Sequence, residues 1–355
     1  MKNICLITFA FLISFCSEDR SPKKRQAAEL PAVQPPPAVY PKENFEKGKI
    51  VPSMNLKSDT TQNFAFYLPT VYSDSAKFPL IIFFDPHGEG TVPLKLYKDL
   101  AEKHHYILIA SNSSKNGLDA NTANRIANNL VNEVMGRFST DKFKITLCGF
   151  SGGAKVALSA GGDIPAVSTI IYCGAAIQFQ PSHPVNLLGF AGKRDMNYTD
   201  VVVFEQSLKD APMKHFLVEW NGKHEFPRAE VFKDAFEFLN KGEIENSEKK
   251  KVTITRQQLE EEQKLKQKYS EAFQKKDLNW WFNDMLTLRA HKNNLMNERL
   301  LGFVSLACYT IVNNALEHND EKAAEYILQI YKMADPDNPA VKDFENQIAK
   351  RRQKK

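Results

Sequence analysis

From residue 48 to 241 the chain alternates short apolar runs with amphipathic stretches, and this alternation limits the possible folds more than any other feature. Runs such as PLIIFF, YILIAS and KITLC are almost entirely apolar, which indicates strands buried on both faces. The stretches between them, for example NTANRIANNLVNEVM, have helical spacing. Apolar strands that alternate with helices predict an α/β fold, in which a mostly parallel sheet is covered by helices on both faces.

The texture of the sequence changes along the chain and divides it into four parts. After a short apolar leader at 1–16, residues 17–47 are rich in Pro, Ala, Lys and Glu, which predicts a flexible linker. The α/β pattern occupies 48–245, and a charged region with helical spacing, 246–355, predicts an all-α module. The length of the chain is compatible with two folded domains of this kind.

The all-α module contains a turn that is similar to those of tetratricopeptide repeats. Pro336 ends one helical segment and Pro339 begins another, in the sequence ADPDNPAVKDF. No second copy recurs at a period of about 34 residues, so the sequence predicts a small helical module without a demonstrated repeat.

The N-terminus predicts export. MKNICLITFAFLISFC has one lysine and then an apolar run that is too short to span a bilayer but suits a secretion signal. Its end, LISFC, resembles a bacterial lipobox and implies Cys16 as the lipid anchor, although Phe15 stands where a small residue is usual. The following SED resembles the surface-export signal of Bacteroidetes lipoproteins. We expect a lipoprotein of the outer membrane or cell surface or, if the signal is cut elsewhere, a periplasmic or secreted protein. Membrane contact is expected through the lipid anchor alone.

Charge and cysteine content exclude several function classes. The net charge of +5 comes from 47 basic against 42 acidic residues, and short basic runs without interleaved aromatic residues do not predict nucleic-acid binding. Cys148, Cys173 and Cys308 each lie in an apolar run, which predicts small buried side chains rather than disulfides. Because no metal-ligand cluster and no dinucleotide motif occurs, we expect neither a metal nor another cofactor.

The sequence CGFSGGAKV allows two interpretations. A phosphate-binding loop would need a second glycine at Ala154 and a hydroxyl at Val156, so that interpretation fails at two positions. The pattern G-x-S-x-G, with Ser151 between a predicted strand and a predicted helix, is typical of a nucleophile on a tight turn. Taken alone, the pattern is also compatible with a glycine-rich structural turn.

A serine nucleophile needs a base, which a third group orients. In a parallel sheet, both partners are expected in loops that follow later strands. Asp195 follows the strand VNLLGFAG, and His224 follows the strand KHFLVEW. Asp200 is the alternative acid, and Glu219 is a poorer one because it lies inside a predicted strand. The order and placement of Asp195 and His224 are stronger evidence than the serine motif itself.

The stretch IIFFDPHGEG predicts a further part of the site. It ends a buried strand in a glycine-containing loop, which can supply a backbone N–H to an oxyanion. The expected donors are Gly152, directly after the serine, and Gly88, although Glu89 is an alternative. His87 is expected to support the loop and to take no part in proton transfer.

The segments FDPHGEG, CGFSGGA, RDMNY and GKHEFP resemble the α/β-hydrolase superfamily, most closely the small esterases of the dienelactone hydrolase, polyhydroxybutyrate depolymerase and feruloyl esterase type. The resemblance covers 48–241 and implies Ser151 as nucleophile, Asp195 as orienting acid and His224 as base. Dienelactone hydrolases proper use a cysteine nucleophile, so the serine favours the esterases.

The expected function is therefore the hydrolysis of carboxylic esters through an acyl-enzyme. About a dozen residues join the strands near 176 and 185, which leaves no room for a helical lid and favours small-molecule or polysaccharide-attached esters. Two alternatives remain open. One is a serine peptidase of the same fold, and the other is a binding or scaffold lipoprotein whose helices, 246–355, bind a protein partner.

Overall fold

The computed structural model describes residues 40, 43–244 and 253–353, so Cys16 and the export signal lie outside the described residues. The described chain divides into two compact units. The first, here called the sheet unit, takes its residues from 37–255 and from 291–303. The second, the helical unit, is formed by 256–290 and 304–355.

The sheet unit contains an eight-stranded sheet of order β1-β2-β4-β3-β5-β6-β7-β8. Strands β3 to β8 are parallel, whereas β2 runs antiparallel to β4 and β1 antiparallel to β2. This is the mostly parallel α/β sheet that the alternating pattern predicts. The strands are β1 (Ile50–Asn55), β2 (Asn63–Tyr67), β3 (Phe78–Phe84), β4 (Ile107–Ser111), β5 (Thr140–Phe150), β6 (Val167–Cys173), β7 (Asn186–Gly192) and β8 (His215–Trp220).

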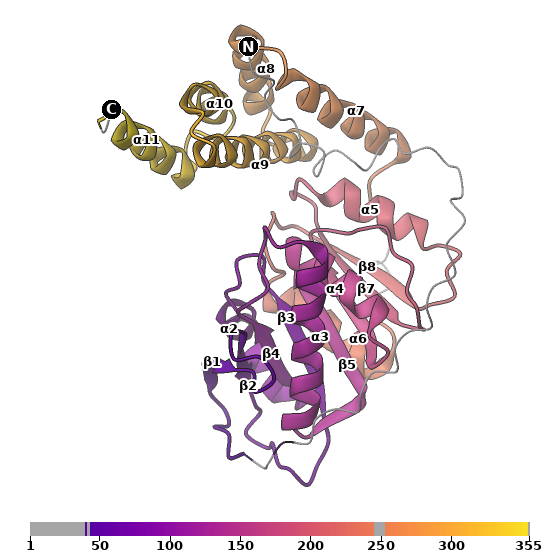
Figure 1. Cartoon of the computed structure of the whole chain (residues 1–355). Helices are drawn as coiled ribbons and strands as arrows, with labels where there is room; N and C mark the ends of the chain where they lie inside the picture. The colour runs from indigo at the N-terminus through magenta and orange to yellow at the C-terminus, as the bar shows by residue number, and fades with distance from the viewer. Residues whose placement is uncertain (1–39, 41–42, 245–252, 354–355) are drawn as a thin grey trace, which may run out of the picture. The chain divides into compact units, whose positions relative to one another are not determined.

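Helices cover both faces of the sheet (Figure 1). On one face, Tyr97 of α2 and Phe232 of α6 stack with ring centroids 3.8 Å apart and pack on the strand residue Phe83. On the other face, Gly161 of α4 lies against Ile170, and α5 packs on β7. Both faces are thereby shielded from water, as parallel sheets require. The helices are α2 (Thr91–His104), α3 (Ala120–Arg137), α4 (Gly152–Asp163), α5 (Tyr198–Ser207) and α6 (Ala229–Lys241).

Two features of the N-terminal region differ from the prediction. The sequence IVPSMN gives no apolar run, yet it forms the edge strand β1, where Pro52 needs no ladder donor. The predicted linker extends to residue 47, but Phe45 is buried and stacks on Phe138 at 4.5 Å. The linker prediction is therefore wrong for 43–47, because a single aromatic side chain in a polar stretch anchors it to the sheet unit.

A buried carboxylate fixes this N-terminal segment. Glu133 of α3 has a fully enclosed side chain and accepts hydrogen bonds from Tyr40 Oη (2.7 Å), Lys57 N (2.7 Å) and Ser58 Oγ (2.9 Å). Arg137 pairs with it at 3.1 Å. Burial opposes the charged form, but the hydrogen bonds together outweigh burial and hold the pKa of Glu133 below its ordinary value.

The helical unit has its own core. Trp281 is fully buried, and Tyr269 stacks on it with ring centroids 5.8 Å apart. As the two prolines predict, α10 ends at Ala334 and α11 begins at Pro339. Helix α9 is long and apolar enough to cross a membrane, a property that it shares with core helices of soluble proteins. The helices of this unit are α7 (Arg256–Ala272), α8 (Leu278–Ala290), α10 (Glu321–Ala334), α11 (Pro339–Arg352) and the part of α9 (Leu295–Glu317) from residue 304 onward. Residues 295–303 of α9 belong to the sheet unit.

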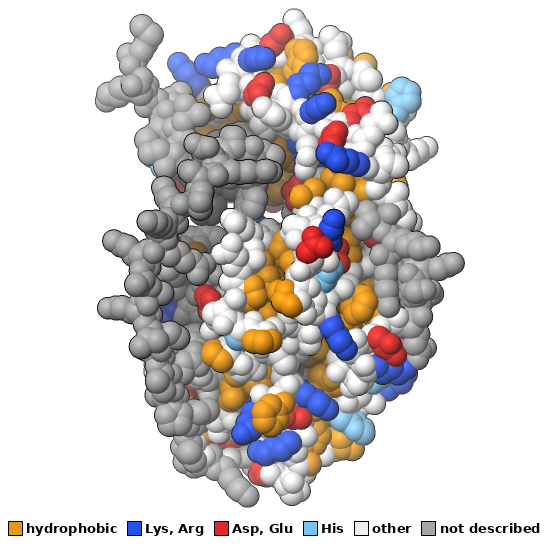
Figure 2. All heavy atoms as spheres, turned by 90° about the vertical axis from the view of Figure 1, so that its right-hand side faces the viewer, with side chains coloured by type: hydrophobic (Ala, Val, Ile, Leu, Met, Phe, Trp, Pro, Cys, Tyr) orange, Lys and Arg blue, Asp and Glu red, His pale blue; other side chains and the backbone are white. Residues whose placement is uncertain are grey.

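The surface carries charges of both signs. On the face drawn in Figure 2, basic and acidic side chains of the described residues are interspersed, with hydrophobic side chains between them. Such mixing is typical of a solvated surface. Cys148, Cys173 and Cys308 are free thiols and buried, as their apolar surroundings predict.

Replacing the buried carboxylate tests the network around Glu133. We expect Glu133→Gln to lower the free energy of unfolding by about 1.5–3 kcal/mol, because charge-assisted hydrogen bonds are lost. The folded-state pKa lies below the ordinary value of 4.5, so this stabilisation is complete above that pH and is lost as the pH falls through the folded-state pKa. Urea unfolding at pH 7 and in mild acid should therefore show a difference between the two proteins that narrows in acid. Glu46→Gln, at an exposed position, is the control and should change stability little at either pH.

Candidate active site

Ser151 lies at the junction of β5 and α4 in an unusual backbone conformation. Its φ is 53° and its ψ −120°, whereas the other two described non-glycine residues with positive φ, His105 and Asn319, have φ of 60° and 57°. His105 has the ordinary left-handed conformation of a helix end, but Ser151 does not. Residues keep such rarely populated backbone conformations only where the surrounding structure enforces them, and they are common at functional sites.

Two glycines enforce this turn. A Cβ on Gly149 would lie 2.0 Å from the carbonyl oxygen of Gly153, and a Cβ on Gly153 would lie 1.9 Å from the carbonyl oxygen of Phe84. No side chain fits at either position, because the nearest atoms belong to the backbone. The glycines of the G-x-S-x-G pattern are thus explained by close packing of β5, α4 and β3, and Lys155 is an exposed helical residue.

The structure brings the three residues expected from the sequence together. His224 Nε2 lies 2.8 Å from Ser151 Oγ, and His224 Nδ1 lies 2.9 and 3.0 Å from the two carboxylate oxygens of Asp195. Asp195 is 1% exposed, whereas the His224 side chain is 23% exposed. The alternative acid Glu219 instead accepts a hydrogen bond from Tyr198. A serine hydroxyl in this arrangement can transfer its proton to the imidazole.

Asp195 lies in the loop 193–197 between β7 and α5, here called the acid loop, and His224 lies in the loop 221–228 between β8 and α6, here called the histidine loop. Backbone contacts fix these two loops to each other. Arg194 N donates to Gly222 O at 2.9 Å, and a Cβ on Gly192 would lie 2.6 Å from the same oxygen. The Asp195 carboxylate also accepts from Asn197 N at 2.8 Å, which orients it within its own loop. Because β7 and β8 are parallel neighbours, their carboxyl ends place the two loops side by side.

The loop after β3 is shaped by Asp85, a residue that the sequence analysis did not single out. Its Oδ1 accepts from His87 N at 2.8 Å and from Glu89 N at 3.2 Å. Gly88 N donates to Asp85 O at 3.2 Å. The N–H groups of His87, Gly88 and Glu89 are therefore engaged within the loop, and oxyanion binding by Gly88 stays a prediction. An acidic residue directly after a buried strand and ahead of successive backbone donors is the signal that could have identified Asp85.

Gly152 occupies the first position of α4, where a helix provides no internal acceptor for the N–H. Partial positive charge at a helix start favours an anion there. The side-chain amide of Asn116 rests against this glycine, since a Cβ on Gly152 would lie 1.8 Å from Asn116 Oδ1. Asn116 N in turn donates to Pro86 O at 2.8 Å, so this asparagine links the serine turn to the loop after β3. Its position depends on tertiary packing, and no sequence motif indicates it.

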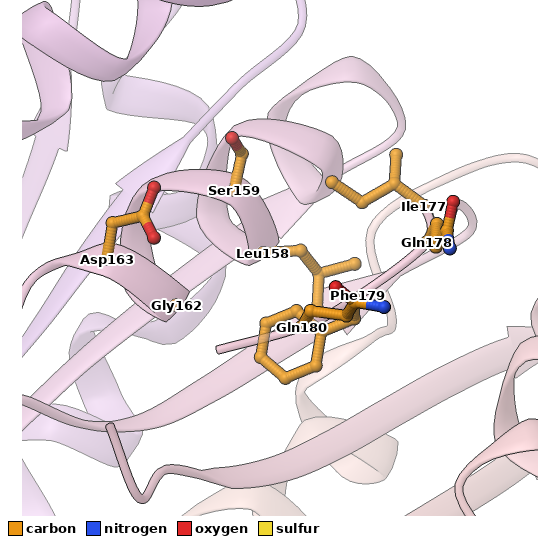
Figure 3. Close-up of a pocket in the computed structure, with 8 residues that line it drawn as sticks. All are labelled: Leu158, Ser159, Gly162, Asp163, Ile177, Gln178, Phe179 and Gln180. Carbon is orange, nitrogen blue, oxygen red and sulfur yellow. The ribbon is translucent and has the colours of Figure 1, made fainter. Parts of the chain in front are cut away.

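A pocket of about 310 Å³ opens elsewhere, between α4 and the loop that follows β6 (Figure 3). Ser159 and Asp163 lie on the helix side, and Ile177 and Phe179 on the loop side. None of Ser151, Asp195 and His224 lines it. Within the described part of the chain, no group of three or more His, Cys, Asp or Glu side chains is arranged to hold a metal ion.

Comparison with known proteins gives similarity at the level of structure. No family model matches the chain, and no curated protein matches its sequence. Three similar solved structures are a Thermogutta terrifontis esterase with butyrate bound, a Rhizomucor miehei esterase, and a Clostridium thermocellum feruloyl esterase module with sinapinate. Their identities are 14%, 12% and 13%, their TM-scores 0.42, 0.43 and 0.44, and the alignments cover 56%, 55% and 54% of this chain and 95%, 84% and 86% of theirs. These identities and TM-scores are too low to indicate a function, so the function of this chain has to be inferred from its own residues.

Two alanine substitutions separate the roles of the glycines around Ser151. We expect Gly153→Ala to lower the free energy of unfolding by about 1–3 kcal/mol or more, since the new methyl group meets backbone atoms of β3. Gly152→Ala meets the end of a single side chain, which can rotate, and should cost less. Thermal unfolding of both variants checks the order. A larger loss for Gly152→Ala would contradict the packing explanation.

Proposed function

We propose that this protein is a serine hydrolase that cleaves carboxylic esters. The observation that carries the proposal is the continuous hydrogen-bonded line from Ser151 Oγ through the His224 imidazole to the buried Asp195 carboxylate. The exceptional backbone conformation of Ser151 supports it, because a structural turn alone gives no reason to hold a serine there.

The first half of the reaction follows from this geometry. His224 Nε2 accepts the proton of Ser151 as the serine oxygen attacks the ester carbonyl carbon, and a tetrahedral intermediate forms. Asp195 accepts a hydrogen bond from Nδ1–H, which keeps the imidazole in the tautomer whose Nε2 faces the serine, and it stabilises the imidazolium. His224 then donates its proton to the alcohol oxygen as the C–O bond breaks, which leaves the acyl group on Ser151.

The second half repeats these proton transfers with water. His224 takes a proton from the attacking water, the new tetrahedral intermediate collapses, and Ser151 regains its proton as the carboxylic acid leaves. In both halves the negative oxygen needs donors. Gly152 N–H at the start of α4 is the first proposed donor, and Gly88 N–H is the proposed second donor, once it exchanges its hydrogen bond to Asp85 for the oxyanion.

Access to Ser151 suits substrates that are small or attached to a polymer. Residues 174–185, which join β6 to β7, contain neither helix nor strand. The short connection agrees with the sequence prediction that no helical lid lies between these strands. We therefore propose small soluble esters or ester groups on polysaccharides as substrates, rather than long-chain triglycerides.

Removing the proposed nucleophile tests the mechanism. We expect Ser151→Ala to lower kcat on short acyl esters by on the order of 10⁴–10⁶-fold and Asp195→Asn by about 10⁴-fold, with stability little changed by the serine substitution. A fluorophosphonate probe should label the wild type, because the serine oxygen bonds to phosphorus and displaces fluoride. Ser151→Ala has no such oxygen and should remain unlabelled.

The same panel discriminates the alternatives. Faster cleavage of peptides than of acyl, acetylated or feruloylated esters would identify a peptidase. Absence of both labelling and turnover in the wild type would contradict the enzyme proposal and favour a binding protein whose helical module docks a partner. Ser159→Ala, a serine of α4 that lies outside the hydrogen-bonded line, is the matched control and should retain activity.

We also propose, from the sequence alone, that the enzyme acts outside the cytoplasm as a lipoprotein. Its support is the apolar leader that ends in a lipobox-like segment at Cys16. If Cys16 carries the lipid, Cys16→Ser should move the protein from the membrane fraction to the soluble fraction, as measured by detergent phase separation. A substituted protein that remains with the membrane would contradict the anchor.

A further inference from the structure

The acid loop is contacted by a segment that is distant in sequence. Residues 291–303 follow two helices of the helical unit, yet they belong to the compact sheet unit. Within this segment, the part from 298 to 302 touches residues on both sides of Asp195. The α/β core is complete before this segment begins, so its position beside the acid loop is an addition to the fold.

Glu298 contacts both loops that hold the proposed catalytic residues. Its Oε2 lies 2.7 Å from Nε of Arg194, the residue that precedes Asp195 in the sequence. Its Oε1 lies 3.7 Å from Nζ of Lys223, the residue that precedes His224. The Glu298 side chain is 18% exposed, whereas those of Arg194 and Lys223 are 40% and 68% exposed. One carboxylate thus bridges the acid loop and the histidine loop, although solvent weakens each ion pair.

Arg299 makes the more buried contact. It is 4% exposed, its Nη1 donates to Lys193 O at 2.7 Å, and its guanidinium lies 4.8 Å from the ring centre of Tyr198. One helical turn further on, Gly302 faces Met196, since a Cβ at Gly302 would be in ordinary contact with Met196 Cβ at 3.5 Å. The arginine therefore contacts Lys193, two residues before Asp195, and Tyr198, the first residue of α5, three residues after it.

We propose that Arg299 and Glu298 are positioning residues that hold the loop of Asp195 in register with His224. The inference deepens the proposed esterase function and rests on it. Neither side chain touches Ser151, and both act through the loops that they hold. Because a misplacement of about 1 Å can lower turnover about 100-fold, a loop fixed at both ends has a direct effect on proton transfer.

The two contacts predict effects of different size. We expect Arg299→Ala to lower kcat by about 10- to 100-fold with KM changed less than about twofold, since the loop moves while the substrate surface stays. Arg299→Lys keeps a cation that can face Tyr198 and reach Lys193 O, so it should recover most of this loss. Glu298→Gln should lower kcat by about two- to fivefold, as expected for the loss of exposed ion pairs.

The matched control is Arg351, which also donates from Nη1 to a backbone carbonyl, that of Leu316, at 2.7 Å but within the helical unit. Arg351→Ala removes the same type of contact and should leave kcat and KM unchanged. Thermal unfolding of every variant shows whether the protein is folded at the assay temperature. If Arg299→Ala does not fold, Arg299→Lys and Glu298→Gln still provide the kcat comparison.

A second measurement separates this inference from the proposed function. In the wild type, the His224 Nδ1 proton that is shared with Asp195 should give a strongly downfield proton resonance. The resonance should broaden or vanish in folded Arg299→Ala and persist in Arg351→Ala. An unchanged resonance and unchanged kcat in folded Arg299→Ala would overturn the positioning role. A wild type without ester turnover or fluorophosphonate labelling would overturn the esterase proposal, while the resonance would still test the loop contact.

Discussion

The close approach of α4 to β5 and β3 is the constraint on which the candidate site depends. It is possible because Gly149 and Gly153 carry no side chain, and it bends the chain so sharply that Ser151 takes a strained conformation above the sheet edge. The same bend starts α4 directly after the serine, which leaves the first N–H groups of the helix for an anion. One steric requirement thus explains the glycine spacing, the backbone conformation of the serine and the preference for negative charge beside it.

Parallel strand geometry supplies the remaining parts of the site. The loops after β3, β5, β7 and β8 all leave the carboxyl edge of one sheet, so residues far apart in sequence meet there. Their alignment depends on loop contacts, such as the hydrogen bond from Arg194 N to Gly222 O and the hydrogen bond from Asn197 N to the Asp195 carboxylate. The sheet therefore sets which loops meet, and the loop contacts set the distances between the side chains of Ser151, His224 and Asp195.

Most of the fold could be predicted because its strands are apolar throughout and its helices are amphipathic. β1 could not be predicted, because the sequence of this edge strand, which contains Pro52, shows neither an alternating pattern nor an apolar run. The burial of Phe45 against Phe138 was missed for a related reason, because one anchoring side chain leaves no pattern in a polar segment. The sequence does not predict that 291–303 packs within the sheet unit. An amphipathic pattern shows which face of a helix is buried, but it does not indicate which element covers that face.

The sequence by itself determined the α/β pattern, the serine turn and the order in which an acid and a histidine follow it. These features are local, since they depend on hydrophobic period, glycine spacing and the loop that follows each strand. Tertiary structure alone decided the distances between Asp195, His224 and Ser151, the position of Asn116 against Gly152, and the contact of Arg299 with Lys193 O. Such contacts join residues separated by many positions, and the energy that selects among them comes from packing and burial, which a linear pattern does not encode.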